Sequence, residues 1–207
     1  MPGGAVSPRG DGPVVALVVS GAGGVEEVRE KFVRPAVERG WTVPVTATPT
    51  GGHWLADQGE TTLLEQLTGF PVRVEARPPG HTSPRPRADC VVVAPASANS
   101  VAKLALGIAD NQALTLASEA IGSRATPVVV FPRINAAHAR HPSWNGHIRA
   151  LTSAGVHLIR GEDVWPLYEP RSAPAGRPLP WPHILNLVDN LLGDLADDPD
   201  SLYGTKW

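Results

Sequence analysis

Residues 89–111 read DCVVVAPASANSVAKLALGIADN, and this stretch decides the fold. The run Cys90–Ala94 is short, wholly apolar and rich in valine, which is typical of a strand buried on both faces. Pro95 removes a backbone donor from the ladder, so we expect the strand to end there. Beyond a small polar loop, apolar residues recur at helical spacing, namely Val101, Leu104, Ala105 and Ile108. The pattern therefore predicts a strand, a turn of small residues and a helix.

The turn at residues 96–100 supports two interpretations. It brings free backbone N–H groups, two hydroxyls and an amide to a helix N-terminus, where the helix dipole favours negative charge, and this outlines a phosphate site. An ordinary loop in which Asn99 or Ser100 caps the helix explains the same residues. The local chemistry leaves both interpretations open.

Other segments alternate between strand and helix patterns. Pro44 lies inside one of the strand patterns, which indicates an edge strand or a bulge. The further strands are expected at Pro13–Ser20, Trp41–Thr48, Val72–Ala76, Thr126–Phe131 and Val156–Ile159. Helices are expected at residues 25–40, 61–68, 113–122, 143–154 and 183–195.

The first apolar run leads directly into a glycine-rich turn. Gly21, Ala22 and Gly23 follow Pro13–Ser20, and a helical pattern begins at Val25. A strand, a glycine-rich turn and a helix begin a nucleotide-binding unit, with the phosphate at the turn. A plain connection between strand and helix remains the alternative. Pro35 is expected to kink or shorten this first helix.

Composition narrows the class of protein. The chain has 207 residues, of which 42% are hydrophobic, and this length fits one domain with tails. A net charge of -2 gives no electrostatic case for nucleic acid or an anionic membrane. A single cysteine excludes an internal disulfide and a cysteine-rich metal site. No apolar run approaches the roughly 20 residues of a membrane span, and the N-terminus lacks the apolar core of a signal peptide, so we expect a cytoplasmic protein without a metal.

The boundaries follow from composition. We expect a flexible arm at residues 1–12, a single domain at residues 13–195 and a loose acidic tail at residues 196–207. Within the domain, residues 161–182 are rich in proline and show no clear period. This stretch is hereafter the 161–182 segment.

Two linked motifs carry a family resemblance. PASANS at residues 95–100 and GIADN at residues 107–111 resemble the PASANT and G-[LIM]-x-D-N signatures of the flavin-containing cysteine decarboxylases. That family includes phosphopantothenoylcysteine decarboxylases and the peptidyl-cysteine decarboxylases of lantibiotic and thioamide-peptide biosynthesis. The resemblance covers about residues 13–159. It implies an α/β fold with a Rossmann-like, doubly wound parallel sheet of about six strands flanked by helices. It also implies FMN bound at a subunit contact in a homotrimer or homododecamer.

The resemblance also assigns cofactor-binding residues. The family has a G-S-[IV]-A-A turn where this chain has Gly21, Ala22 and Gly23, so the serine hydroxyl is missing here. TPTGGHWL, from residue 48, resembles the family segment T-K-S-x-x-H/A-F-L. The FMN-binding residues that the resemblance implies are Gly21, Ala22, Gly23, Thr48, Thr50, Ser97, Ala98, Asn99, Ser100, Asp110, Asn111 and Arg133.

Two catalytic residues follow in the same way. His81 lies eight residues before Asp89, which is the position of the family's catalytic histidine, and an imidazole can accept a proton at cellular pH. Because residues 77–87 form a proline-rich loop, an incidental solvated histidine remains the alternative. Pro132 and Asn135 match the family's substrate signature P-x-M-N-x-x-M-W, in which the asparagine binds the substrate's cysteine carboxylate. A plain turn residue is the alternative for Asn135.

The implied reaction begins when FMN takes a hydride from the Cβ of a cysteine, giving a thioaldehyde; CO2 then leaves, and an enethiol and reduced flavin remain. Phosphopantothenoylcysteine decarboxylases carry a flap cysteine that serves the subsequent reduction. This chain has only Cys90, and the 161–182 segment, where the family's flap lies, has none. We therefore expect an FMN-dependent oxidative decarboxylase of a C-terminal cysteine peptide. A small cysteine conjugate as substrate, or a flavin-binding protein without decarboxylase activity, are the alternatives.

Overall fold

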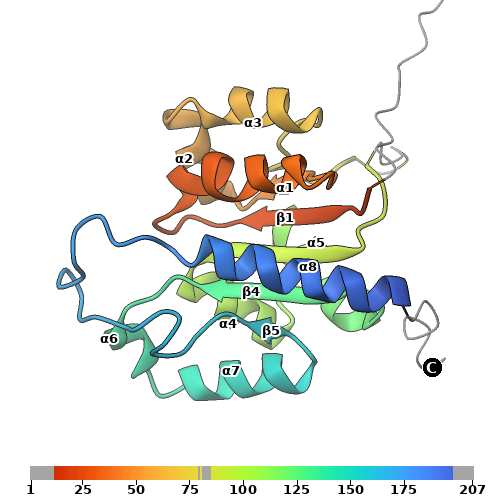
Figure 1. Cartoon of the computed structure of the whole chain (residues 1–207). Helices are drawn as coiled ribbons and strands as arrows, with labels where there is room; N and C mark the ends of the chain where they lie inside the picture. The colour runs from red at the N-terminus through yellow and green to blue at the C-terminus, as the bar shows by residue number, and fades with distance from the viewer. Residues whose placement is uncertain (1–11, 79, 81–84, 198–207) are drawn as a thin grey trace, which may run out of the picture.

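The chain folds around a five-stranded parallel sheet in the order β2-β1-β3-β4-β5 (Figure 1). The computed structural model describes residues 12–78, 80 and 85–197. The strands are β1 (Val15–Val19), β2 (Val45–Ala47), β3 (Cys90–Ala96), β4 (Val128–Pro132) and β5 (His157–Leu158).

Helices connect successive strands. The described helices are η1 (Val25–Glu27), η2 (Arg29–Val33), α1 (Arg34–Glu38), α2 (Pro49–Asp57), α3 (Glu60–Thr68), α4 (Ala98–Leu106), α5 (Gln112–Ser123), α6 (Ala136–Ala139), α7 (Trp144–Ser153) and α8 (Trp181–Asp197). The 25–38 stretch begins with a 3₁₀ turn and a π-helical turn and becomes α-helical only at Arg34. Pro35 lies in the first turn of α1, directly after the π-helical turn, and the predicted kink or shortening stays a prediction.

The sheet is buried on both faces, because alternate residues of its strands enter two separate apolar clusters. Leu17 packs in a cluster with residues of η2, α1, α2, α3 and α8, and α8 crosses in front of the sheet in Figure 1. Val18 packs in a second cluster with residues of α4, α5 and α7. This explains why the strands read as continuous apolar runs. The predicted Rossmann-like, doubly wound α/β fold is confirmed.

The strand order fixes where a ligand site can form. The chain leaves β1 toward β2 on one side and leaves β3 toward β4 on the other, so the connections diverge between β1 and β3. In open α/β sheets, ligands bind outside the carboxyl ends of the strands at such a switch point. These ends and the loop before α8 lie on the left of Figure 1.

The described residues form five strands, close to the predicted number of about six. The Val72–Ala76 segment forms only an isolated bridge, in which Arg73 pairs with Thr46 of the edge strand β2. The Arg85 guanidinium covers the same edge, since it donates to Val45 O at 2.7 Å and to Thr46 Oγ1 at 2.6 Å. Val45 O also accepts from Arg73 N–H at 3.0 Å, so the Arg85 side chain and the Val72–Ala76 segment meet at the same edge of β2. The expectation of an edge strand beside Pro44 is confirmed.

The expectation that the central strand stops at Pro95 is wrong. β3 continues to Ala96 through a cis Ala94–Pro95 peptide bond, and its register with β4 shifts between Val93 and Ala96. Pairing resumes where Ala96 O accepts from Arg133 N–H at 2.8 Å. Because the irregularity falls at Pro95, its missing N–H interrupts the regular ladder without ending the strand.

The 161–182 segment packs against the body near its two ends, whereas residues 169–176 are exposed. Trp165 and Leu179 are buried, and Trp181 donates from Nε1 to Glu27 Oε2 at 2.9 Å. The predicted arm and tail lie almost wholly outside the described residues. Among the helices that are described, none has the length and apolar character needed to cross a membrane.

Candidate functional site

Three helix N-termini meet at a cleft of about 380 Å³ at the switch point. Thr48, Ser97 and Asn111 are the N-cap residues of α2, α4 and α5, and all three line this cleft. Each side chain accepts a backbone N–H of its own helix, at distances of 3.2, 3.2 and 3.1 Å. Helix N-termini carry partial positive charge, so the cleft suits a negatively charged ligand.

The predicted cofactor-binding residues largely converge here. The cleft is lined by Gly21, Thr48, Pro49, Thr50, Ser97, Asn99, Ser100, Lys103, Asp110, Asn111 and Leu114. Eight of these were singled out from the sequence, whereas Ala22, Gly23, Ala98 and Arg133 are not part of the lining. The N-cap of α4 is Ser97, not Asn99 or Ser100 as the plain-loop interpretation expected.

The glycine turn fits closely against α2. An ideal Cβ on Gly21 would lie 2.4 Å from Thr50 Cγ2 and 2.9 Å from Thr50 Cβ. Only a residue without a side chain lets these two segments approach so closely. Ala22 is buried and its N–H donates to Ser20 O at 2.8 Å, so this turn donor is used within the protein.

Ser20, which the sequence reasoning missed, links the two central strands. Its Oγ donates to Pro95 O at 2.8 Å and accepts from Ser97 N–H at 2.7 Å. The side chain is 1% exposed, and both of its hydrogen bonds reach across 75 residues or more of sequence. A lone hydroxyl at the end of an otherwise apolar strand was the available signal.

Lys103 is the second residue that the sequence reasoning missed. It lines the cleft and forms an ion pair with Asp110, and this hydrogen bond holds the pKa of the Asp110 carboxyl below its ordinary value. Asn111 donates from Nδ2 to the other oxygen of Asp110 at 3.0 Å. The GIADN residues thus form a small polar network that fixes the start of α5. Lys103 could have been noticed as the charged member of an otherwise apolar and small helix.

Arg133 and Asn135 lie at the carboxyl end of β4. The Arg133 guanidinium reaches Gly23, because an ideal Cβ on Gly23 would be 3.6 Å from Arg133 Nη2. Asn135 caps α6, and its Oδ1 accepts from His138 N–H at 3.0 Å. With Oδ1 in this bond, the Nδ2 group is left to donate to a ligand. Asn135 therefore combines the turn role with an available donor.

The 161–182 segment lies next to this substrate signature. Tyr168 O accepts from Ala136 N–H at 2.8 Å, and Arg140 makes a two-point ion pair with Glu169. A second cleft of about 260 Å³ lies between the two stretches, with Pro132, Ile134, Ala139, Trp144, Asn145, Arg160, Gly161, Glu162, Trp165 and Leu167 in its lining. The arrangement brings the two candidate substrate elements together.

The two remaining predictions concern His81 and metal binding. His81 lies outside the described residues. Among the residues that are described, no group of histidine, cysteine, aspartate and glutamate could hold a metal ion.

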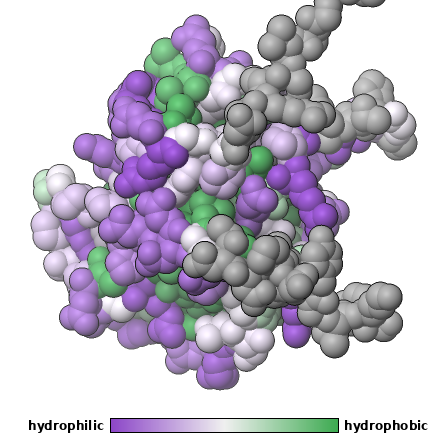
Figure 2. All heavy atoms as spheres, turned by 45° about the vertical axis from the view of Figure 1, so that its right-hand side comes forward, coloured by the Kyte–Doolittle hydropathy of each residue, from purple (hydrophilic) through white to green (hydrophobic). Residues whose placement is uncertain are grey.

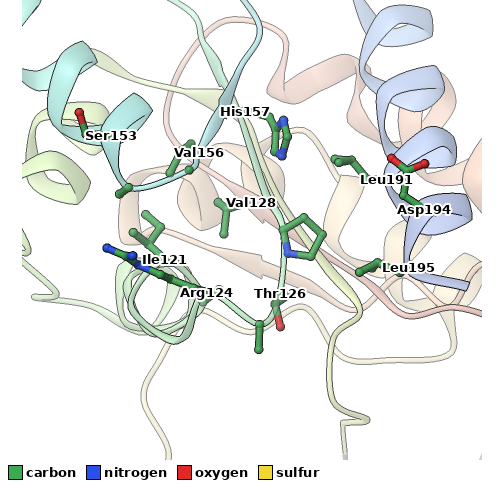
Figure 3. Close-up of a pocket in the computed structure, with 15 residues that line it drawn as sticks. Ile121, Arg124, Thr126, Val128, Ser153, Val156, His157, Leu191, Asp194 and Leu195 are labelled. Atoms are coloured by element: carbon green, nitrogen blue, oxygen red, sulfur yellow. The ribbon is translucent and has the colours of Figure 1, made fainter. Parts of the chain in front are cut away.

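Another hollow of about 380 Å³ lies at the opposite, amino end of the sheet. Figure 3 shows His157 at the start of β5, Arg124 at the end of α5, and Leu191 and Asp194 on α8 around it. Figure 2 brings this side of the molecule forward and shows apolar surface between polar side chains. None of the predicted site residues lines this hollow, so the switch-point cleft is the candidate site.

The fold and the cleft define a class of protein, namely a doubly wound α/β protein with three helix N-termini at a cleft at its topological switch point. The chain belongs to the Flavoprotein family, whose model matches residues 9–193. The flavin cofactor thus has the support of the family as well as of the site.

Individual relatives agree with this assignment. The chain is 31% identical over 97 residues to the coenzyme A biosynthesis bifunctional protein CoaBC of Thermococcus kodakarensis, a match that covers 47% of this chain and 23% of the relative. It thus spans less than a quarter of that relative's length. The crystal structure of the FMN-dependent cysteine decarboxylase SpaF aligns with a TM-score of 0.57 and 24% identity over 75% of this chain and 85% of SpaF. The structure of a mutant PPC decarboxylase aligns with a TM-score of 0.61 and 22% identity over 86% of this chain and 99% of that structure. These structural likenesses bear on the fold.

Proposed function

We propose that the protein is an FMN-dependent decarboxylase that oxidises the C-terminal cysteine of a peptide and releases an enethiol. The observation that carries the proposal is the switch-point cleft, where three helix N-termini and most of the predicted FMN-binding residues meet. The similarity to FMN-dependent cysteine decarboxylases such as SpaF supports this chemistry. The cofactor would be held in the cleft of one subunit of a homotrimer or homododecamer.

The residues of the cleft fit FMN chemically. The first-turn N–H group of Asn99 has no helical carbonyl four residues back, so it can donate to an anionic or carbonyl oxygen. The hydroxyl of Thr50 can donate to the ligand or accept from it. The Asp110 carboxylate can accept from a ligand hydroxyl. Bound FMN would supply a two-electron acceptor for oxidation of the cysteine Cβ–S unit.

The chain's own residues would bind and orient the substrate. Asn135 would donate from Nδ2 to the carboxylate that is lost, because its Oδ1 is already committed to the start of α6. His81 would accept a proton of the substrate as a general base. Trp165 and Leu167 of the 161–182 segment line the second cleft and would keep water from it.

The choice of product depends on the 161–182 segment. No cysteine occurs in this segment, and the only thiol of the chain, Cys90, is buried in β3. Burial raises the pKa of this thiol to about 12, so it is a poor proton donor and far from reactive. With no thiol to support a reductive half-reaction, the enethiol would be the final product.

The test is incubation of the flavin-loaded protein with a varied set of peptides that end in cysteine. A mass loss equal to CO2 plus two hydrogens is the expected result, with the same peptides ending in serine as the matched control. Absence of this loss from every cysteine peptide would contradict the proposal.

The similarity to CoaBC favours a second candidate, decarboxylation of 4′-phosphopantothenoylcysteine. Release of 4′-phosphopantetheine by the purified protein would establish this candidate and refute our interpretation of the 161–182 segment. A protein that binds FMN but converts neither kind of substrate would instead be a flavin-binding protein without decarboxylase activity.

A further inference from the structure

Two arginines pack against one buried tryptophan at the carboxyl end of β4. The Arg177 Cζ lies 3.4 Å from the centroid of the Trp165 ring, and the Arg133 Cζ lies 5.0 Å from it. Trp165 is 4% exposed and meets Phe131 edge-on, with the ring centroids 5.4 Å apart. The ring is therefore fixed by the core, and it holds both guanidinium groups in place.

Neither of these arginines forms an ion pair with a described residue. Ion pairs in the described part of the chain involve Arg29, Arg34, Arg39 and Arg140, but neither Arg133 nor Arg177. Arg133 Nε is buried without a hydrogen-bond partner among the described residues. A guanidinium can only donate, so any group that completes it must be an acceptor.

The surroundings of Arg177 are mixed in charge. Burial lowers the pKa of Arg177, Tyr168 raises it, the charge of Arg133 lowers it and Glu162 raises it. Glu162 is thus the acid that offsets part of the charge, and it lines the second cleft beside Trp165. Two partly desolvated cations on one ring repel each other, and a bound anion would remove that repulsion.

Arg133 lies near residues that belong to or adjoin the two clefts, although it lines neither cleft. Arg133 Nη2 lies beside Gly23, two residues after Gly21 of the switch-point cleft. Arg133 also follows Pro132, which lines the second cleft together with Trp165.

We propose that Arg133 and Arg177 together bind an oxyanion of the ligand, either a phosphate or a carboxylate. Planar guanidinium groups match both anions through paired hydrogen bonds. Because Arg177 comes from the 161–182 segment and Arg133 from the body, the bound anion would also hold the segment closed. This inference rests on the proposed function only in naming the ligand, FMN or the cysteine peptide, that carries the anion.

The experiment uses the full chain with the variants R133M, R177M and R177K. R171M, which alters an exposed arginine of the same segment, is the matched control. The first arm measures affinity for FMN and for riboflavin, which lacks the phosphate, by flavin fluorescence. The second arm measures, on FMN-loaded protein, the binding of a peptide that ends in serine with a free carboxylate or as the carboxamide. These serine peptides have no thiol to be oxidised.

We expect R133M and R177M to weaken binding of one anionic probe by about tenfold or more, since charge-assisted hydrogen bonds are lost. The matching neutral probe should bind as it does to the wild type, R177K should lose less than R177M, and R171M should not change. If only FMN binds more weakly, the bound anion is the cofactor phosphate. If only the peptide with a free carboxylate binds more weakly, the bound anion is the substrate carboxylate.

The proposal is overturned if both methionine variants bind all four probes like the wild type, even if their melting temperatures fall, because the arginines would then serve packing alone. It is equally overturned if each anionic probe and its neutral counterpart weaken by the same factor. Failure of the decarboxylase proposal is a separate result, since cysteine peptides would then stay intact while the anion dependence of binding persists.

Discussion

Replacing Gly21 by alanine should both destabilise the fold and weaken flavin binding. The new Cβ would lie 2.4 Å from Thr50 Cγ2 and 2.9 Å from Thr50 Cβ. Rotation about χ1 of Thr50 moves Cγ2 but leaves Cβ in place, so the first turn of α2 must shift. Overpacking of this kind costs about 1–3 kcal/mol. For a chain of this size each kcal/mol lowers the melting temperature by about 2–4 °C.

The assay compares G21A with G146A by thermal unfolding of the flavin-free proteins. Gly146 lies exposed in α7, and an added Cβ there meets no atom within 4 Å. Alanine is a better helix former than glycine, so G146A should be stabilised by about 0.5–1 kcal/mol. Both substitutions replace glycine by alanine, but G21A should lower the melting temperature and G146A should raise it.

A double variant tests the stated cause. T50S removes the Cγ2 methyl group but keeps the hydroxyl and Cβ, so G21A/T50S should recover part of the stability that G21A loses. A double-mutant cycle of the wild type, G21A, T50S and G21A/T50S should therefore give a coupling energy clearly different from zero. Flavin affinity should fall in G21A because Gly21 and Thr50 both line the cleft. If G21A unfolds at the wild-type temperature and binds FMN equally well, the close approach of turn and helix does not shape the site.

Three further predictions follow from single residues. S97A should lose about 1 kcal/mol in denaturant unfolding through its N-cap bond, whereas S143A should lose less because Ser143 makes no side-chain cap bond. Because burial raises the pKa of Cys90 in the folded state to about 12 from 9.0, the free energy of unfolding should fall as pH rises from about 9 to 12. C90A should remove that part of the pH dependence. A thiol-reactive dye should label the wild type at pH 8 only after unfolding. H81N should lower the decarboxylation rate about a hundredfold or more without changing FMN affinity. H53N, which changes an exposed histidine, is the control. An unchanged decarboxylation rate in H81N would exclude the general-base role.

The features predicted correctly from the sequence are local ones. The strand that begins at Cys90 and the helix that follows it were visible because burial and helical period repeat within a few residues. Edge placement of β2 followed from Pro44 alone, since proline cannot serve a central ladder. The continuation of β3 through Pro95 was missed because it depends on the register with β4, which no local pattern encodes.

The features missed in the site depend on contacts between distant residues. Ser20 meets Ser97 across 77 residues, and Arg85 reaches Val45 across 40. Such pairs follow from the strand order, which places β1 beside β3 and leaves β2 at the edge. The sequence indicates that each of these residues is polar among apolar neighbours, but it does not indicate which partner the side chain will meet.

The distribution of donors in the cleft bears on the missing turn serine, which the family pattern G-S-[IV]-A-A predicts where this chain has Ala22. Ala22 N–H and Gly24 N–H already bond to Ser20 O and Glu26 Oε2, so the turn itself offers few free donors. The starts of α2, α4 and α5 instead bring three positive helix ends to one cleft. Lys103 is held there by Asp110, so the pair adds little net charge. An anion bound in this cleft would therefore meet chiefly backbone N–H groups at helix starts, and these do not depend on a turn hydroxyl.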